Sequence, residues 1–190
     1  MTPDDVELLT RMRAGDEAAF AELFARHQGP IFRYALHMCG PAAADDVVQE
    51  TFLALIRQPH GFNASRGTVG AYLFGIARHH VYKQCGLRIA DCGLIEEFDD
   101  SSARSPDPGS SALAGLERAE TIGLVRDAVQ TLPAAYREVV VLCELQEMDY
   151  ADVAAVLECP IGTVRSRLHR ARALLTQKLG NLRRNLSVHR

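Results

Sequence analysis

The chain has 190 residues, 47% of them hydrophobic, and a net charge of −3, which suits one medium globular domain or two small ones. Its longest aliphatic run is only Val139–Leu142, and the amino-terminal stretch MTPDDVELL is acidic. Neither a membrane span nor a signal peptide is therefore predicted, and we expect a cytoplasmic protein that is not itself inserted in a membrane.

Charge is sorted along the sequence. Residues 61–95 carry four basic and one acidic side chain, and residues 160–190 carry eight basic and no acidic ones. Acidic side chains outnumber basic ones nine to five in residues 1–60, and seven to two in both 96–120 and 121–159. Two cationic blocks separated by acidic ones predict two places where a polyanion binds.

Apolar residues at helical spacing predict three helices in the first half of the chain. The first follows Asp16, a candidate N-cap, the second begins at Asp45–Asp46, and the third runs from about Gly70 to Gln84. Their predicted inward positions are Phe20, Leu23, Phe24, His27, Val48, Phe52, Leu55, Ile56, Leu73, Ile76, Ala77 and Val81.

A solvated segment follows, EEFDDSSARSPDPGSSALAG at residues 96–115, which combines acids, Ser, Pro and Gly with almost no large apolar residue. This composition is typical of a flexible acidic linker. It predicts an N-terminal domain at 1–95 and a C-terminal domain at 116–190. Because no convincing alternating strand pattern occurs on either side, we expect an all-α fold of two small helical domains.

The second half begins with a periodic helix over Leu116–Thr131, and Pro133 is placed to open the next helix, PAAYREVVVLCELQ. The run Val139–Val141 is β-branched and could mark a strand. The Pro-Ala-Ala start and the lack of any partner strand favour a buried helix instead.

A helix-turn-helix is predicted after residue 148. Asp149 is placed to cap a short helix over Tyr150–Glu158, with Asp152 in a capping-box-like position. A second helix starts between Pro160 and Val164.

The last helix has two different sides at about 100° per residue. Its apolar side carries Val164, Leu168, Ala171, Leu175, Lys178, Leu179 and Leu182. Arg165, Ser166, His169 and Arg170 share the opposite face, with Arg167 and Arg172 on its two flanks. Such a face suits the DNA major groove, where Arg bonds guanine bidentately, although cationic helix faces are also common as solvated surface.

Three stretches, taken together, resemble bacterial sigma factors of the extracytoplasmic-function (ECF) type. PIGTVRSRLHRAR, preceded by LPAAYREVVVLCELQEMDYADVAAVL, resembles their C-terminal promoter-reading domain. DDVVQETFLAL resembles the helix that binds the polymerase clamp, and FNASRGTVGAYLFGIARHHVYKQ resembles the promoter-melting segment. The resemblance covers about residues 10–180 in the family's order, with a linker where the family has one.

The resemblance implies three sets of contacts. The set for duplex DNA at the minus 35 element is Thr163, Arg165, Ser166, Arg167, His169, Arg170 and Arg172. The set for the separated strand at the minus 10 element is Asn63, Ser65, Arg66, Tyr72, Arg78, His79 and Lys83. The set for the basic clamp coiled coil of RNA polymerase core is Asp45, Asp46, Gln49 and Glu50.

Some of these residues could instead have ordinary structural roles: helix capping for Asp45 and Asp46, a core position for Tyr72, and an exposed helix surface for His79. Glu158 stands where the family usually has Gly. Because Glu lacks the easy left-handed conformation of Gly, we expect Pro160 to end that helix.

The implied partners are RNA polymerase core, through its clamp coiled coil and flap, promoter DNA and an anti-sigma factor. No nucleophile–base set or carboxylate pair suggests an enzyme, and no cofactor is expected. One alternative is a stand-alone helix-turn-helix regulator that binds an operator as a dimer. Another is a metal- or redox-responsive protein using His79, His80, Cys85 and Cys92, although five scattered cysteines without a CxxC pair do not favour it.

Overall fold

The computed structural model describes residues 3–86 and 116–188, with side chains described for 3–86 and 123–180. Every regular element within these ranges is helical, so the all-α prediction is confirmed. The N-terminal half contains α1 (Asp5–Arg13), α2 (Glu17–Cys39), α3 (Pro41–Arg57), the one-turn 3-10 helix η1 (Ala64–Arg66) and α4 (Val69–Gln84). The C-terminal half contains α5 (Leu116–Gln130), α6 (Ala134–Val140), the π-helical turn η3 (Val141–Leu145), α7 (Tyr150–Leu157) and α8 (Ile161–Val188).

The starts of α2 and α3 follow two different local signals. Asp16 is the N-cap of α2, as predicted, and its Oδ1 accepts hydrogen bonds from the backbone N–H groups of Ala18 and Ala19 at 3.0 and 3.2 Å. The predicted start of α3 was four residues late. The helix begins at Pro41, after Gly40 at φ 81°, because proline at the first helical position lacks only an N–H that has no helical partner there.

Aromatic side chains of α2 and α3 pack at the edge of the N-terminal core, and the predicted inward residues Phe20, Phe24, His27 and Ile76 are only half-buried. The Phe24 and Phe52 rings lie 4.7 Å apart between centroids, and Phe20 meets Phe52 edge-on at 6.1 Å. Leu23, Val48, Phe52, Leu55, Leu73, Ala77 and Val81 are buried as predicted. Ile56 is not: it is 51% exposed, because it follows Leu55 by one residue and so turns beyond the buried side of α3.

In the C-terminal half, the β-branched run Val139–Val141 is helical and buried, as predicted. Pro133 is the N-cap of α6 and not its first helical residue; its ψ of 143° is extended.

The helix-turn-helix is formed by α7 and α8, with three departures from expectation. Asp149 occupies the N-cap of α7 without a side-chain capping bond, and the predicted capping-box role of Asp152 is wrong because its carboxylate bonds Thr68 of the other half. Glu158 itself adopts the left-handed conformation, at φ 52° and ψ 42°, and is the C-cap of α7, so the expectation that Pro160 would end this helix was wrong. A non-glycine residue there costs roughly 1–2 kcal/mol.

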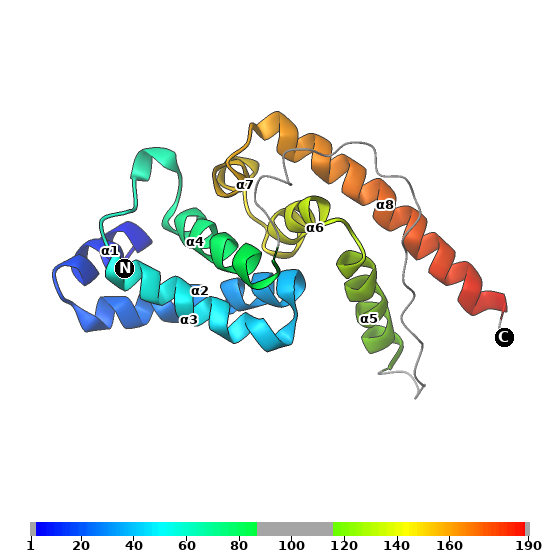
Figure 1. The fold of residues 1–190 in the computed structure, drawn as a ribbon, viewed down its shortest axis with the longest axis horizontal. Helices are drawn as coiled ribbons and strands as arrows, with labels where there is room; N and C mark the ends of the chain where they lie inside the picture. Colours follow the sequence, from blue (N-terminus) through cyan, green and yellow to red (C-terminus); the bar gives the residue numbers. More distant parts are fainter. Residues whose placement is uncertain (1–2, 87–115, 189–190) are drawn as a thin grey trace.

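The two halves pack on each other. α7 lies against α4, and α5 and α6 lie against α2, so that one hydrophobic core continues through both halves (Figure 1). The predicted linker at 96–115 falls outside the described residues. None of the described helices is long and apolar enough to cross a bilayer.

Candidate nucleic-acid and polymerase interfaces

The start of α8 separates a core side from a polar side. Val164, Leu168 and Ala171 are buried, whereas the four residues of the opposite face are exposed. These are Arg165, Ser166, His169 and Arg170. The predicted division is confirmed for these seven residues, whereas Leu175, Lys178 and Leu179 of the predicted apolar side are half-buried and the side chain of Leu182 lies outside the described residues. The polar face combines two guanidinium groups with an imidazole and a hydroxyl in reach of solvent.

The residues beside this face behave differently. Thr163 is half-buried, and its carbonyl accepts a hydrogen bond from the Ser166 hydroxyl at 3.0 Å. Arg167 is only 8% exposed and belongs to the core side of α8. Arg172 is exposed and forms an ion pair with Glu144 of η3, to which its Nε donates at 3.1 Å. That hydrogen bond raises the pKa of Arg172, so any DNA contact by this residue competes with Glu144.

The segment before α4 is organised by Asn63. Its Oδ1 accepts from the backbone N–H of Ser65 at 3.0 Å and from the Ser65 hydroxyl at 2.8 Å, which makes Asn63 the N-cap of η1. Arg66 follows on an exposed turn. The structure thus presents Arg66 to solvent, while the side chains of Asn63 and Ser65 bond each other.

On α4 the predicted residues divide by burial. His79 and Lys83 are exposed. Tyr72 is half-buried against Phe62, with ring centroids 5.8 Å apart, and burial raises the pKa of its phenol. Arg78 is only 3% exposed, and its Nε donates to Glu138 of α6 at 3.0 Å.

Glu138 of α6 is a residue that the sequence interpretation did not single out. Its side chain is fully buried and accepts three hydrogen bonds from the N-terminal half. Oε1 accepts from the Tyr34 hydroxyl at 2.7 Å and from Arg78 Nε at 3.0 Å, and Oε2 accepts from the Tyr82 hydroxyl at 2.8 Å. We call Tyr34, Arg78, Tyr82 and Glu138 the Glu138 cluster. The sequence signal was an acid, Glu138, directly before the apolar run Val139–Cys143.

The Glu138 cluster brings charged and ionisable groups together in a buried place, which affects the pKa of Tyr34. Burial, followed by the charge and hydrogen bond of Glu138, raises the pKa of Tyr34 well above its ordinary value. The Arg78 guanidinium carbon lies 4.9 Å from the centre of the Tyr82 ring, within cation–π distance. The cluster therefore holds a buried carboxylate opposite a buried cation.

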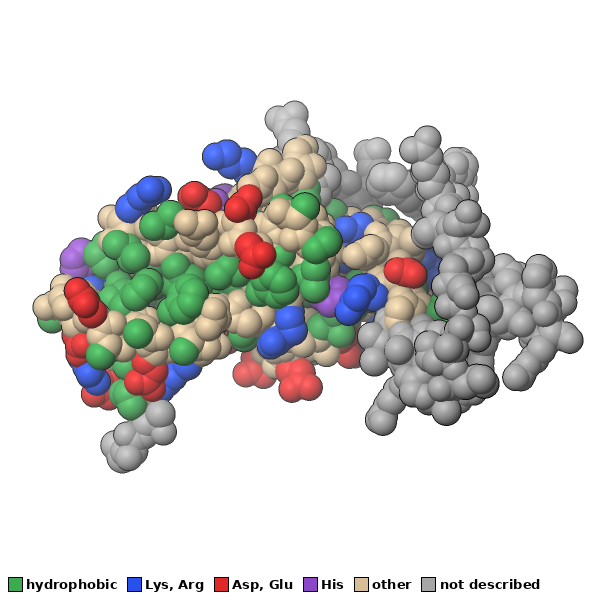
Figure 2. Space-filling view, turned by 90° about the horizontal axis from the view of Figure 1, so that it is seen from below, with side chains coloured by type: hydrophobic (Ala, Val, Ile, Leu, Met, Phe, Trp, Pro, Cys, Tyr) green, Lys and Arg blue, Asp and Glu red, His purple; other side chains and the backbone are tan. Residues whose placement is uncertain are grey.

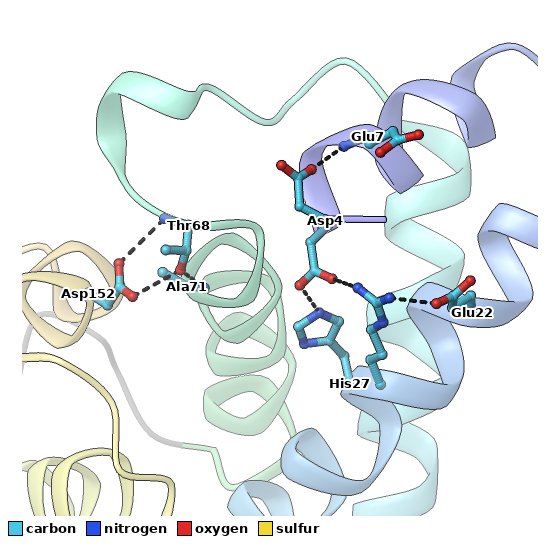
Figure 3. A network of polar contacts seen from close by, with 9 residues as sticks. Asp4, Glu7, Glu22, His27, Thr68, Ala71 and Asp152 are labelled. Carbon is cyan, nitrogen blue, oxygen red and sulfur yellow. Dashed lines mark hydrogen bonds and ion pairs between the residues drawn. The ribbon is translucent and has the colours of Figure 1, made fainter. Parts of the chain in front are cut away.

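A second polar network, near the start of α4, ties α1 to α2 (Figure 3). Asp5 Oδ1 accepts from Arg26 Nη1 at 2.7 Å, and Asp5 Oδ2 lies 2.6 Å from His27 Nε2. Burial acts to raise the pKa of Asp5, but the hydrogen bonds from Arg26 and His27 outweigh it and the net pKa is lowered. Close by, the Thr68 hydroxyl donates to Asp152 Oδ2 at 2.9 Å and caps α4 by accepting from Ala71 N–H at 3.1 Å.

The predicted polymerase-binding residues lie on α3. Asp45, Asp46 and Gln49 are exposed, and Glu50 is half-buried. Figure 2 shows the molecule from below the view of Figure 1, with apolar side chains gathered along the middle of the N-terminal half and both acidic and basic side chains around them. The exposed carboxylates of Asp45 and Asp46 are the groups in this set that would attract a basic partner.

The described cysteines give no sign of reactive thiols. Burial raises the pKa of Cys85 and Cys159, and it raises that of Cys39 and Cys143 to about 11. Within residues 3–86 and 116–188 no three His, Cys, Asp or Glu side chains gather as a metal site. Cys92, part of the alternative metal set, lies outside the described residues.

Comparison with known proteins identifies the family. A model of sigma-70 region 2 matches residues 23–86, and one of sigma-70 region 4 matches residues 122–175. The RNA polymerase sigma-H factor of Pseudomonas aeruginosa is 31% identical over 191 residues, covering 95% of this chain and 96% of that protein. The ECF RNA polymerase sigma-E factor of Haemophilus influenzae is 30% identical over 188 residues, covering 92% and 95%. The chain belongs to the ECF RNA polymerase sigma factors.

Solved structures similar to this sigma factor agree with the assignment. CnrH in complex with the cytosolic domain of CnrY aligns with a TM-score of 0.68 at 27% identity, covering 94% of this chain and 97% of the other. The sigma factor RpoE of Bartonella quintana, in complex with the anti-sigma factor NepR, aligns with a TM-score of 0.62 at 26% identity, covering 85% and 96%. The relatives favour a sigma factor over a stand-alone regulator.

Proposed function

We propose that this sigma factor binds RNA polymerase core and directs initiation at promoters that it reads with two separate surfaces. The observation that carries the proposal is the exposed group Arg165, Ser166, His169 and Arg170 over the buried side of α8. Arg165 and Arg170 bond guanine edges of the minus 35 element, and Ser166 and His169 bond bases or phosphates. Thr163, Arg167 and Arg172 support this helix on the DNA.

The second surface serves the minus 10 element after strand separation. Arg66, His79 and Lys83 are exposed cationic or polar groups suited to a single-stranded backbone, and the half-buried Tyr72 of α4 is an aromatic ring on which a base could stack. Asn63 and Ser65 shape the turn in front of α4. Arg78 joins this surface once α6 no longer covers it.

The polymerase contact completes the assignment. Asp45, Asp46, Gln49 and Glu50 face the basic clamp coiled coil, and the C-terminal half meets the flap. RNA synthesis is carried out by the polymerase, so this chain is not an enzyme, and it acts in the cytoplasm without a cofactor. We retain 1–95, 96–115 and 116–190 as N-terminal domain, linker and C-terminal domain.

Regulation by a protein partner is part of the proposal. In the two similar solved structures the sigma factor is in complex with another protein, the cytosolic domain of CnrY or the anti-sigma factor NepR. An anti-sigma factor that covers the polymerase-binding surfaces controls this chain in a comparable way.

Transcription in vitro from a library of randomised promoters tests the proposed function. Polymerase core plus this chain is expected to enrich two sequence blocks at minus 35 and minus 10, which core alone does not enrich. A parallel gel shift uses the enriched DNA with the chain alone and with core. A dimer of the free chain that shifts this DNA as well as the holoenzyme does would support the stand-alone regulator and overturn the sigma function.

A further inference from the structure

We propose that Arg13 of α1 is a positioning residue for promoter recognition, because it holds the loop in front of η1 in the shape that meets the minus 10 strand. We call residues 58–63, between α3 and η1, the 58–63 loop. The inference rests on the proposed function, since it adds a residue to the minus 10 surface. Arg13 lies outside residues 23–86, the part of the chain that matches sigma-70 region 2.

A direct hydrogen bond ties the 58–63 loop to α1. Arg13 Nε donates to the Pro59 carbonyl at 2.7 Å, although the two residues are 46 positions apart in the sequence. α1 thus lies beside the segment that connects α3 to α4 (Figure 1). Hydrogen bonds from a charged donor are stronger than neutral ones, so this contact restrains the backbone of the loop.

Tyr72 of α4 contacts the same loop. A Cβ added at Gly61 would lie 2.4 Å from Tyr72 Oη and 3.3 Å from its Cζ. The Tyr72 ring also packs on Phe62, with centroids 5.8 Å apart. Any residue larger than glycine at position 61 would therefore displace either the loop or the ring. The loop is held by α1 through Pro59 and by α4 through Gly61 and Phe62.

Bonds within the loop fix the place of its tip. The Gly61 N–H donates to the Gln58 carbonyl at 3.1 Å, which closes a turn with Pro59 and His60 in its middle. Asn63 then caps η1 through its side chain. His60 is exposed at the tip of this turn. The restrained backbone thus presents an imidazole, which can donate or accept a hydrogen bond, next to the turn that carries the minus 10 residues.

The guanidinium of Arg13 has a second donor that the free chain leaves unused. Its Nη2 is buried and has no hydrogen-bond partner among the described residues. A buried donor without an acceptor is unfavourable. The Arg13 charge also reaches Tyr72: burial raises the pKa of the Tyr72 phenol, and this charge acts against the increase. Arg13 therefore holds the loop while keeping a donor for a small adjustment of the loop around the bound strand.

α1 itself is attached to the N-terminal half without help from Arg13. Leu8 and Leu9 of α1 are buried in the core, and Asp5 bonds Arg26 of α2. Because these contacts do not involve Arg13, its replacement should leave α1 in place and release only the loop. A positioning role thus predicts a defect at the minus 10 element without a comparable loss of stability.

The first test compares Arg13→Gln with wild type and with Arg57→Gln, an exposed arginine at the end of α3 that serves as the charge-matched control. Each chain is assembled with polymerase core and used to select from promoters randomised at both elements. For Arg13→Gln, preference for the favoured bases at minus 10 is expected to fall about tenfold, the size of one lost base contact. Preference at minus 35 and the thermal midpoint of the free chain are expected to stay close to wild type.

A fluorescent base gives a second readout of the same variants. 2-Aminopurine in the minus 10 element becomes brighter when it leaves the stack, and Arg13→Gln holoenzyme should produce less of this increase than wild type or Arg57→Gln. Arg13→Lys keeps a charged donor and is expected to recover part of it. Wild-type minus 10 preference and fluorescence in Arg13→Gln would overturn the proposal. Equal losses at minus 10 and minus 35 would also contradict it, because they indicate a general structural defect.

A second set of variants tests the loop without changing Arg13, should Arg13→Gln fail to fold. Gly61→Ala places a methyl group against the Tyr72 hydroxyl and is expected to reduce minus 10 preference as Arg13→Gln does. Tyr72→Phe removes that oxygen. The double variant is therefore expected to regain most of the preference that Tyr72→Phe has alone. A Gly61→Ala chain with wild-type preference would show that the position of the loop does not matter.

The outcomes separate this inference from the proposed function. Enrichment of both promoter blocks by wild type with core reports the sigma function, whatever Arg13 does. If wild type enriches neither block, the proposed function and this inference fail together. If wild type and Arg13→Gln enrich both blocks equally, only the role of Arg13 is rejected.

Discussion

Arg165 on α8 and Arg78 on α4 are both arginines predicted to contact promoter DNA, yet they lie in opposite environments. Arg165 is exposed on a helix face whose other side is core. Arg78 is buried and bonded to Glu138, a residue 60 positions away in the sequence. A basic side chain on a helix that is predicted to read DNA is therefore accessible only if the neighbouring half of the chain leaves it exposed.

The sharpest way to test this contrast is the same substitution at both positions. Arg78→Ala leaves Glu138 buried without its cation and is expected to lower the free energy of unfolding by about 3–5 kcal/mol, or by less if opening relieves the unpaired charge. Arg165→Ala, on the exposed face, is expected to change it by less than about 0.5 kcal/mol. Urea denaturation of both variants measures the difference, and equal effects would remove the contrast.

Promoter binding is expected to show the role of the exposed arginines of α8. Arg165→Ala or Arg170→Ala should weaken specific promoter binding by holoenzyme by ~1–3 kcal/mol without loss of fold, as for an arginine that contacts bases. Competition between the cognate promoter and one changed at the minus 35 element checks this. Normal transcription of the cognate promoter by both variants would show that this face does not read DNA.

A smaller effect is expected where the two halves meet at their exposed edge. Asp152→Asn weakens the charged hydrogen bond to Thr68 and is expected to cost about 0.5–1.5 kcal/mol of stability. Asp149→Asn, on the same helix, is the control because Asp149 makes no side-chain capping bond. A thermal shift confined to Asp152→Asn supports the contact, whereas equal shifts would assign the loss to α7 alone.

The smallest expected effect is a pH dependence at the contact between α2 and α5. Burial lowers the pKa of His37, and the Arg126 charge lowers it further. Since the unfolded chain then binds more protons than the folded one, stability is present above the ordinary histidine pKa of 6.5 and decreases as the pH falls below it. His37→Gln should reduce this decrease between pH 7.5 and 5.5 in urea titrations. An unchanged pH dependence in the variant would rule out His37 as its source.

Much of each helix could be predicted from the sequence because apolar spacing reflects packing within one helix. The four exposed residues of α8 and the buried Val164, Leu168 and Ala171 follow directly from that spacing. Local caps were predictable where a side chain bonds its own helix, as at Asp16.

Contacts between distant segments were not predictable in this way. Asp152 has the spacing of a capping-box residue but bonds Thr68, and Arg78 is predicted to contact DNA but is buried and bonds Glu138 of α6. Glu158 adopts a conformation that its side chain disfavours, because the turn between α7 and α8 demands it. For Asp152 and Arg78 the partner lies far away in the sequence, and for Glu158 the constraint is set by the three-dimensional turn between two helices.

The burial of α6 has a thermal consequence. Its residues Ala135, Tyr136, Val139 and Val140 belong to one apolar core that continues through both halves, and Glu138 is buried as well. Melting α6 would therefore expose both halves to water at once, so heating the free chain should produce a single calorimetric transition, with the calorimetric enthalpy equal to the van't Hoff enthalpy. Once the halves separate, each should melt as its own cooperative unit. The number of transitions in the heat-capacity curve therefore reports whether the two halves are packed together or apart.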